Sequence, residues 1–147
     1  DYQNDFDINV LGAVKALKKY EKPLKSSGKG SIILFSTVAV GQGMPFHTSI
    51  SASKGAIEGI VRSLGAEFAP TVRVNGIAPT VTDTQLSSRI LRNEKARERV
   101  KERHPLQSII QPEEIAHTAK FLLSDAAKNI TGQIIGVDAG LSSLNLK

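Results

Sequence analysis

Residues 31–36, with the sequence SIILFS, form an uninterrupted apolar run between two serines. An apolar run of this length without polar alternation predicts a β-strand that is covered on both faces, as strands of parallel sheets are. Two further short strands are predicted downstream, VRVNGI at 72–77 and QIIGVD at 133–138. Parallel strands must be joined by crossover connections, so the segments around these strands should contain helices.

The spacing of apolar residues predicts those helices. They cover residues 4–22, 49–68, 85–103 and 113–123. Pro23 and Pro70 are expected to end the first two, and Pro112 to open the last at its first helical position. This alternation of helices and strands predicts an α/β layer fold with a parallel sheet and helices on both faces. Three strands are few for such a sheet, so we interpret residues 1–147 as a single partial domain.

Composition excludes several classes of site. The 147 residues include no cysteine, which rules out disulfides, thiol catalysis and cysteine-based metal sites. No apolar run approaches the roughly 18 residues of a membrane span, and no His/Asp/Glu cluster has metal-ligand spacing. We therefore expect a cytoplasmic protein with no membrane partner and no metal.

The net charge of +5 has a local origin. Residues 84–104 carry seven Lys or Arg against three Glu, a surplus of four positive charges. Acids interleave with the bases and aromatic residues are absent, so a solvated helix face is the preferred interpretation. A lid or anion-binding role is the alternative, and nucleic acid is not expected as a partner.

Five stretches, in order and spacing, resemble the short-chain dehydrogenase/reductase (SDR) family. They are DINVLG at 7–12, SIILFST at 31–37, SASKGA at 51–56, VRVN at 72–75 followed by AP at 78–79, and FLLSD at 121–125 with ITGQ at 130–133 and VDAG at 137–140. The whole chain resembles the later half of that family's Rossmann-like fold. The resemblance implies an oxidoreductase that uses NAD or NADP and acts on a small alcohol or carbonyl substrate.

The resemblance also implies roles for individual residues. Asn9, Thr37 and Lys54 match the family's catalytic positions, Thr37 standing where the family usually has serine. Lys54 also matches the residue that binds the cofactor's ribose. Pro79, Thr82 and Thr84 match the cofactor loop, in which Thr80 replaces the usual glycine. Ordinary structural roles are the alternatives: hydrogen bonding for Asn9 and at the strand end for Thr37, and helix capping for the threonines of the loop.

Two departures limit what the resemblance implies. The family's catalytic tyrosine falls on Ile50, which has no ionisable proton to give. His47 lies three residues earlier and could replace it as proton donor, because histidine titrates near neutral pH. The glycine-rich phosphate loop is also missing, together with the first β–α units. We therefore expect a truncated chain that does not bind cofactor tightly by itself, and an impaired enzyme or, alternatively, a non-catalytic dinucleotide-binding or structural subunit.

Family members commonly pair through two long helices, which here match residues 4–22 and 49–68. Gly55 and Gly59 leave one side of the second helix without side chains, which would allow a neighbouring helix to approach closely. A homodimer or homotetramer through these helices is expected.

Overall fold

The structure is a computed structural model that describes residues 2–145. Its helices and strands are α1 (Tyr2–Phe6), a π-helical turn (Asp7–Leu11), α2 (Gly12–Ser27), β1 (Gly30–Phe35), α3 (Thr48–Glu67), β2 (Val72–Pro79), α4 (Glu94–Glu102), α5 (Pro112–Leu123) and β3 (Ile134–Val137). Short 3-10 turns occupy Val38–Val40, Gln85–Ser87 and Asp125–Ala127.

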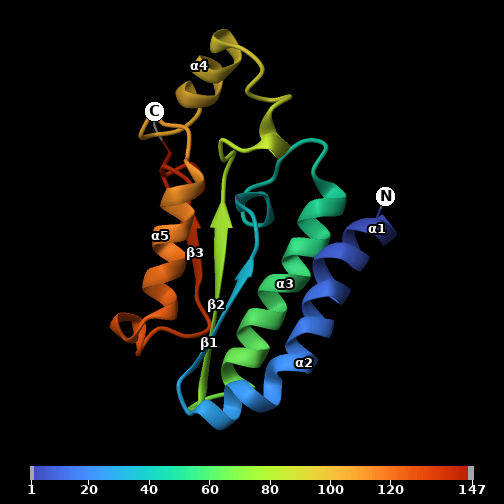
Figure 1. The fold of residues 1–147 in the computed structure, drawn as a ribbon. Helices are drawn as coiled ribbons and strands as arrows, with labels where there is room; N and C mark the ends of the chain where they lie inside the picture. Colours follow the sequence, from blue (N-terminus) through green and yellow to red (C-terminus); the bar gives the residue numbers. More distant parts are fainter. Residues whose placement is uncertain (1, 146–147) are drawn as a thin grey trace.

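The three strands form one parallel sheet in the order β1-β2-β3. Helices α2 and α3 cover one face of this sheet, and α5 covers the other (Figure 1). The predicted α/β fold with helices on both faces is therefore confirmed, and each predicted strand is present to within two residues at either end.

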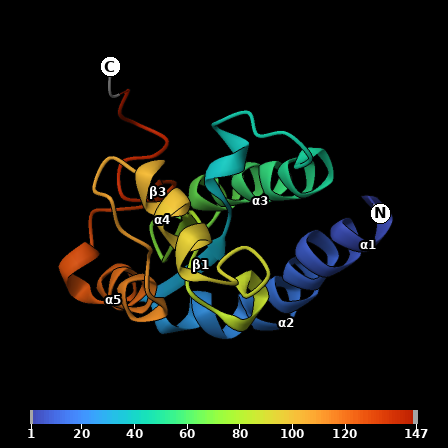
Figure 2. The same ribbon diagram turned by 90° about the horizontal axis from the view of Figure 1, so that it is seen from above.

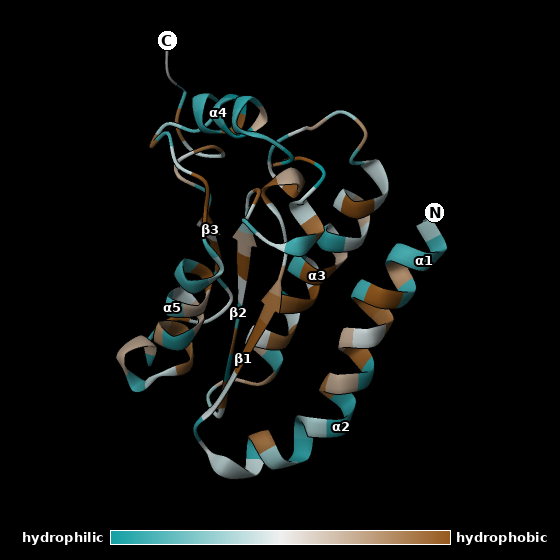
Figure 3. Cartoon of the chain, turned by 45° about the horizontal axis from the view of Figure 1, so that its top comes forward, coloured by the Kyte–Doolittle hydropathy of each residue, from teal (hydrophilic) through white to brown (hydrophobic). Residues whose placement is uncertain are grey.

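Alternate residues of β2 supply the two halves of the core. Val72 and Val74 pack with Val61 and Phe68 under α3, where all four side chains are nearly or fully inaccessible. Ile77 points to the opposite face and packs with Leu122 of α5. Because successive side chains of a strand point to opposite faces, β2 packs against the helices on both sides of the sheet. Figure 3 shows the same contrast in hydropathy: β1 is hydrophobic, whereas α4 at the edge of the molecule is hydrophilic.

Two predicted helix boundaries were wrong. Helix α2 continues through Pro23 to Ser27 and ends at Gly28, which adopts a left-handed conformation with φ 64°. A proline in a helix loses its own hydrogen bond and disturbs the turn before it, but the packing of Leu17 and Leu24 on the sheet holds the helix together on both sides.

The helix predicted over 85–103 is also broken. A 3-10 turn covers only Gln85–Ser87, and the regular helix α4 starts after Asn93, whose side chain accepts a hydrogen bond from the Ala96 amide at 2.9 Å. Asparagine is a strong N-cap, so this local bond starts a new helix where the charge pattern indicated a continuous one.

None of the helices in residues 2–145 combines the length and the apolar character that a membrane span requires.

Leu122 should carry a large share of the stability of the α5 layer. Its side chain has no exposed surface, whereas the neighbouring Leu123 is 52% exposed. Leu122→Ala should lower the free energy of unfolding by about 2–5 kcal/mol, because it leaves a cavity between α5 and the sheet. Urea unfolding followed by circular dichroism measures this loss. Leu123→Ala is the matched control and should change stability far less; equal losses from both would contradict the packing described.

Candidate active site

A cleft of about 490 Å³ opens at the edge of the sheet where the strands end. Its walls come from the end of β1, the loop before α3, the loop after β2, helix α4 and the segment after β3. The lining residues are Thr37, Val38, Met44, Pro45, His47, Thr80, Val81, Ile90, Val100, Arg103, His104 and Leu141. Figure 2, which looks down on this edge, shows α4 lying over the strands. Ligand sites of open parallel sheets form at this edge because the loops converge there.

Thr37 lies at the wall of the cleft directly after β1. Its side-chain oxygen accepts a weak hydrogen bond of 3.4 Å from the Ala39 amide, which caps the short 3-10 turn. A hydroxyl has one hydrogen to donate and two lone pairs, so this contact leaves the hydrogen available for a ligand. The preceding Ser36 is buried and donates to Glu58 on α3 at 2.9 Å instead.

His47 stands at the start of α3 and shares the cleft with Thr37. Its Nδ1 lies 2.7 Å from the carbonyl oxygen of Pro45. A carbonyl can only accept, so Nδ1 carries the hydrogen, and Nε2 is left as the second site for a proton. Ile50 lies one turn further along α3 and is not among the residues that line the cleft.

Lys54 projects from α3 toward the end of β1, where its Nζ donates to the carbonyl oxygen of Phe35 at 2.9 Å. Burial lowers the pKa of the Lys54 amine, because partial removal from water disfavours the charged form. Its only hydrogen-bond partner in the described chain is this one carbonyl, although an ammonium group can donate three bonds. The amine is therefore suited to bind further oxygen atoms, such as ribose hydroxyls.

Asn9 lies in the π-helical turn that interrupts the first helix. Its side-chain amide donates to the Asp5 carbonyl at 3.0 Å, and Asp5 in turn bonds Ser49 of α3. Such π-turns occur frequently at functional sites. Asn9 itself is not part of the cleft wall.

The proposed cofactor-loop residues leave the end of β2 together, but they make local contacts. Pro79 is the last residue of β2, and the Thr82 hydroxyl donates to the Thr80 carbonyl at 3.1 Å. The Thr84 amide donates to the Ser87 hydroxyl at 3.0 Å at the head of a 3-10 turn. None of Pro79, Thr82 and Thr84 lines the cleft.

Sequence reasoning missed His104, which is 3% exposed and joins the end of α4 to the loop after β2. Its Nδ1 donates to the Val100 carbonyl of α4 at 2.6 Å, and its Nε2 lies 2.9 Å from the hydroxyl of Thr80. A glycine at position 80 could not make this second bond. The only signal in the sequence was Thr80 in place of the usual glycine. The structure explains it, because the Thr80 hydroxyl is the partner of His104.

Asp138 directly follows β3 and organises the turn after it. It accepts hydrogen bonds from the Gly140 amide at 2.9 Å and from the Ser142 amide at 3.0 Å, and the Ser142 hydroxyl also bonds it. Burial by itself would raise the pKa of this carboxyl, but these hydrogen bonds and the nearby His104 outweigh burial and lower the pKa. The ionised carboxylate therefore holds the turn that carries Leu141 into the cleft.

Asp138→Asn should destabilise the fold at neutral pH by about 1.5–3 kcal/mol, the usual range for hydrogen bonds to a charged group. Because the folded-state pKa is lowered, the carboxylate stabilises the fold above the ordinary aspartate range and loses that effect as the pH falls through the folded value. The difference between wild type and variant should shrink below about pH 4. Urea unfolding at several pH values tests this, with the exposed Asp125→Asn as control; a difference that does not change with pH would contradict it.

The family follows from comparison with known proteins. A sequence profile described as enoyl-(acyl carrier protein) reductase matches residues 1–142. The chain belongs to the short-chain dehydrogenase/reductase family. The Rossmann-like part of the predicted fold class is therefore confirmed as well.

Individual SDR relatives agree with this assignment. The chain is 33% identical over 142 residues to a 3-oxoacyl-[acyl-carrier-protein] reductase of Thermotoga maritima, covering 96% of this chain and 57% of the relative. It is 42% identical over 146 residues to a tropinone reductase homologue of Arabidopsis thaliana, covering 97% and 53%. Among solved structures, a gluconate 5-dehydrogenase of Burkholderia cenocepacia in complex with NADP and tartrate superposes with a TM-score of 0.92 at 25% identity, covering 99% and 57%. The chain thus spans about half the length of the relatives it matches.

Within residues 2–145, no group of three or more His, Cys, Asp or Glu is placed to hold a metal ion. The candidate SDR residues fall into three sets, of which Pro79, Thr82 and Thr84 at the end of β2 and in the loop after it form one. Thr37 and His47 line the cleft, whereas Asn9, Ile50 and Lys54 lie on the helices beside it.

Proposed function

We propose that the whole protein is an oxidoreductase that transfers hydride between NAD or NADP and a small alcohol or carbonyl compound, and that its turnover is impaired. Membership of the SDR family supports the general activity. One observation supports the impairment: Ile50 occupies the proton donor's position, while the hydroxyl of Thr37 and the amine of Lys54 remain at the end of β1.

The residues of this chain fit only part of the cofactor. Lys54 would bind ribose hydroxyls, and Pro79, Thr82 and Thr84 would lie near the nicotinamide. When bound, the nicotinamide supplies or accepts the hydride. The pyrophosphate needs a glycine-rich turn at a helix N-terminus, and this sequence contains none. We therefore propose that these residues by themselves bind NADH and NADPH only weakly.

Reduction of the substrate carbonyl also requires a proton donor in the protein. The Thr37 hydroxyl would donate a hydrogen bond to the carbonyl oxygen and orient it. As the alkoxide develops, a positioned acid must protonate it, which the hydrocarbon side chain of Ile50 cannot do. His47, which lines the same cleft as Thr37, is the candidate for that acid, because its Nδ1 is bonded to Pro45 and its Nε2 can carry the proton to be transferred. A non-catalytic dinucleotide-binding subunit is the second candidate function, favoured by the same isoleucine.

Ile50→Tyr in the full-length protein should raise carbonyl reduction by about 10²–10⁴-fold, the usual contribution of a positioned acid. The reason is that Lys54, one helical turn after position 50, and the Thr37 hydroxyl would assist a phenol there. The rate of NADPH or NADH oxidation with a panel of simple ketones measures the gain. Ile50→Phe, which has the ring without the hydroxyl, is the matched control; an equal rise in both variants would contradict the lost-donor interpretation.

His47→Ala should abolish the residual reduction by the wild type if His47 is the donor. That residual rate should fall as the pH rises, because only the protonated imidazole can give up a proton. His117→Ala is the control, since His117 is exposed on α5 and lies outside the cleft. Wild-type turnover at rates ordinary for the family, unchanged in His47→Ala, would refute both the impairment and the substitute donor.

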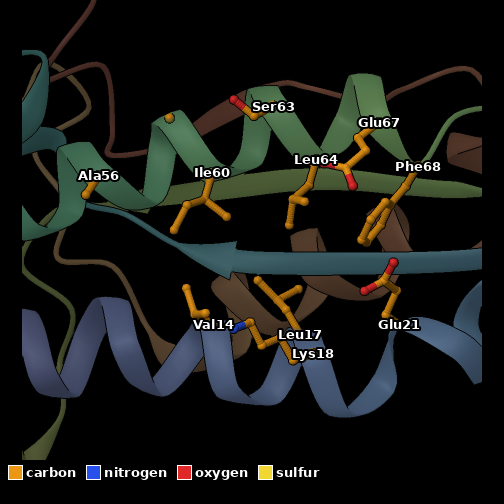
Figure 4. Close-up of a pocket in the computed structure, with 11 residues that line it drawn as sticks. Val14, Leu17, Lys18, Glu21, Ala56, Ile60, Ser63, Leu64, Glu67 and Phe68 are labelled. Carbon is orange, nitrogen blue, oxygen red and sulfur yellow. The ribbon is translucent and has the colours of Figure 1, made fainter.

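We also propose that the protein forms a homodimer or homotetramer through α2 and α3. A largely apolar groove runs between these helices, with Leu17 on one wall and Ile60 and Leu64 on the other (Figure 4). Lys18 and Glu67 stand on opposite walls of the groove, so two copies related by a twofold axis could pair opposite charges. Such self-complementarity is what a symmetric interface requires.

Gly59→Arg should convert the oligomer to smaller species. A Cβ at this exposed groove position would meet no atom within 4 Å in the monomer, so the variant should fold, yet the long cation would obstruct a second helix pair. Sedimentation velocity at micromolar concentration measures the result. Gly43→Arg, at an equally open position in a loop, is the control. A monomeric wild type would exclude the proposed interface.

A further inference from the structure

The cleft at the end of the sheet has an unbalanced charge. Its walls are mostly apolar, and each ionisable side chain on them is basic: His47, Arg103 and His104. No carboxylate is among the lining residues. Of the three bases, His104 has both ring nitrogens engaged by Val100 and Thr80, so it offers no free donor to a ligand. Arg103 is the one permanently charged group on the cleft wall.

Arg103 also lacks the ion-pair partner that two neighbouring basic residues have. The basic helix α4 places Arg97 against Asp83 at 2.6 Å and Lys101 against Glu98. Arg103 takes part in none of the ion pairs within 4 Å in residues 2–145. Glu102, the neighbour of Arg103 in sequence, lines a separate small cleft that Arg103 also borders.

The position of Arg103 is fixed on both sides. It forms the C-cap of α4, with its amide bonded to the last turn of the helix. The next residue, His104, ties that helix end to Thr80 after β2 at 2.9 Å. Further on, the Leu106 amide donates to the Ala139 carbonyl after β3 at 3.1 Å. The Arg103 backbone is therefore held at the rim of the cleft, and from there its exposed side chain can reach a ligand.

We infer that the substrate is a carboxylate-bearing carbonyl compound or its alcohol, with an apolar link between the two groups, and that Arg103 is its specificity-determining residue. The inference rests on the proposed carbonyl chemistry at Thr37. Arginine presents a fork of N–H donors that matches a carboxylate, and the apolar wall formed by Val81, Ile90 and Leu141 suits the link. The volume of about 490 Å³ is in the range of sites for small molecules.

Binding, which does not depend on turnover, tests this inference. The full-length protein with saturating NADPH or NADH is titrated with 5-oxohexanoate and with its neutral methyl ester, followed by calorimetry or ligand-observed NMR. The wild type should bind the carboxylate about ten- to a hundredfold more tightly than the ester, the range expected for a charge-assisted hydrogen bond. Arg103→Met should remove this preference without changing the affinity for the ester, and Arg103→Lys should retain part of it.

Arg99→Met is the matched control, because Arg99 is an exposed arginine of the same helix that does not line the cleft. It should leave the preference intact. Equal binding of carboxylate and ester by the wild type, a preference that survives Arg103→Met, or an equal loss in Arg99→Met would overturn the inference. Selective binding through Arg103 without any hydride transfer would support the carboxylate site while refuting the proposed oxidoreductase activity, so the two can fail separately.

Discussion

Burial of β2 between two helical layers is the constraint on which the rest of the structure depends. Val74 and Ile77 are both fully inaccessible to solvent, and they lie on opposite faces of the strand. One strand therefore joins the α2–α3 layer to the α5 layer. Because β1 and β3 pair with it in parallel, all three strands end at the same edge of the sheet. The site exists because of that common edge.

The loops at this edge are held by polar contacts together with a small buried apolar cluster of Leu91, Val100 and Ile109. His104 joins the end of α4 to Thr80, and Asp138 holds the turn after β3 through Gly140 and Ser142. Asp83 and Arg97 make a further link between the loop after β2 and α4, and this pairing lowers the pKa of the Asp83 carboxyl. The charged segment that looks like a solvated helix face in the sequence is therefore also a wall of the cleft.

The proposed chemistry depends on groups at this same edge. The Thr37 hydroxyl and the Lys54 amine remain, and both have unused donor capacity. In the proposed reaction Ile50 stands at the position of the proton donor, and His47 lines the same cleft as Thr37. A site of this kind could still bind and orient a substrate while transferring protons slowly, which is why binding and turnover have to be measured separately.

The sequence by itself determined the fold class, the strands and the SDR resemblance, because long apolar runs and ordered motifs are local signals. It failed at Pro23 and at Asn93, where packing and a single cap outweighed the pattern of residues along the chain. Only the tertiary structure brought His104 to Thr80 and placed Arg103 in the same cleft as Thr37. Those residues lie 24 or more positions apart along the chain, and no spacing rule relates them; their meeting depends on the parallel sheet ending all its strands at one edge.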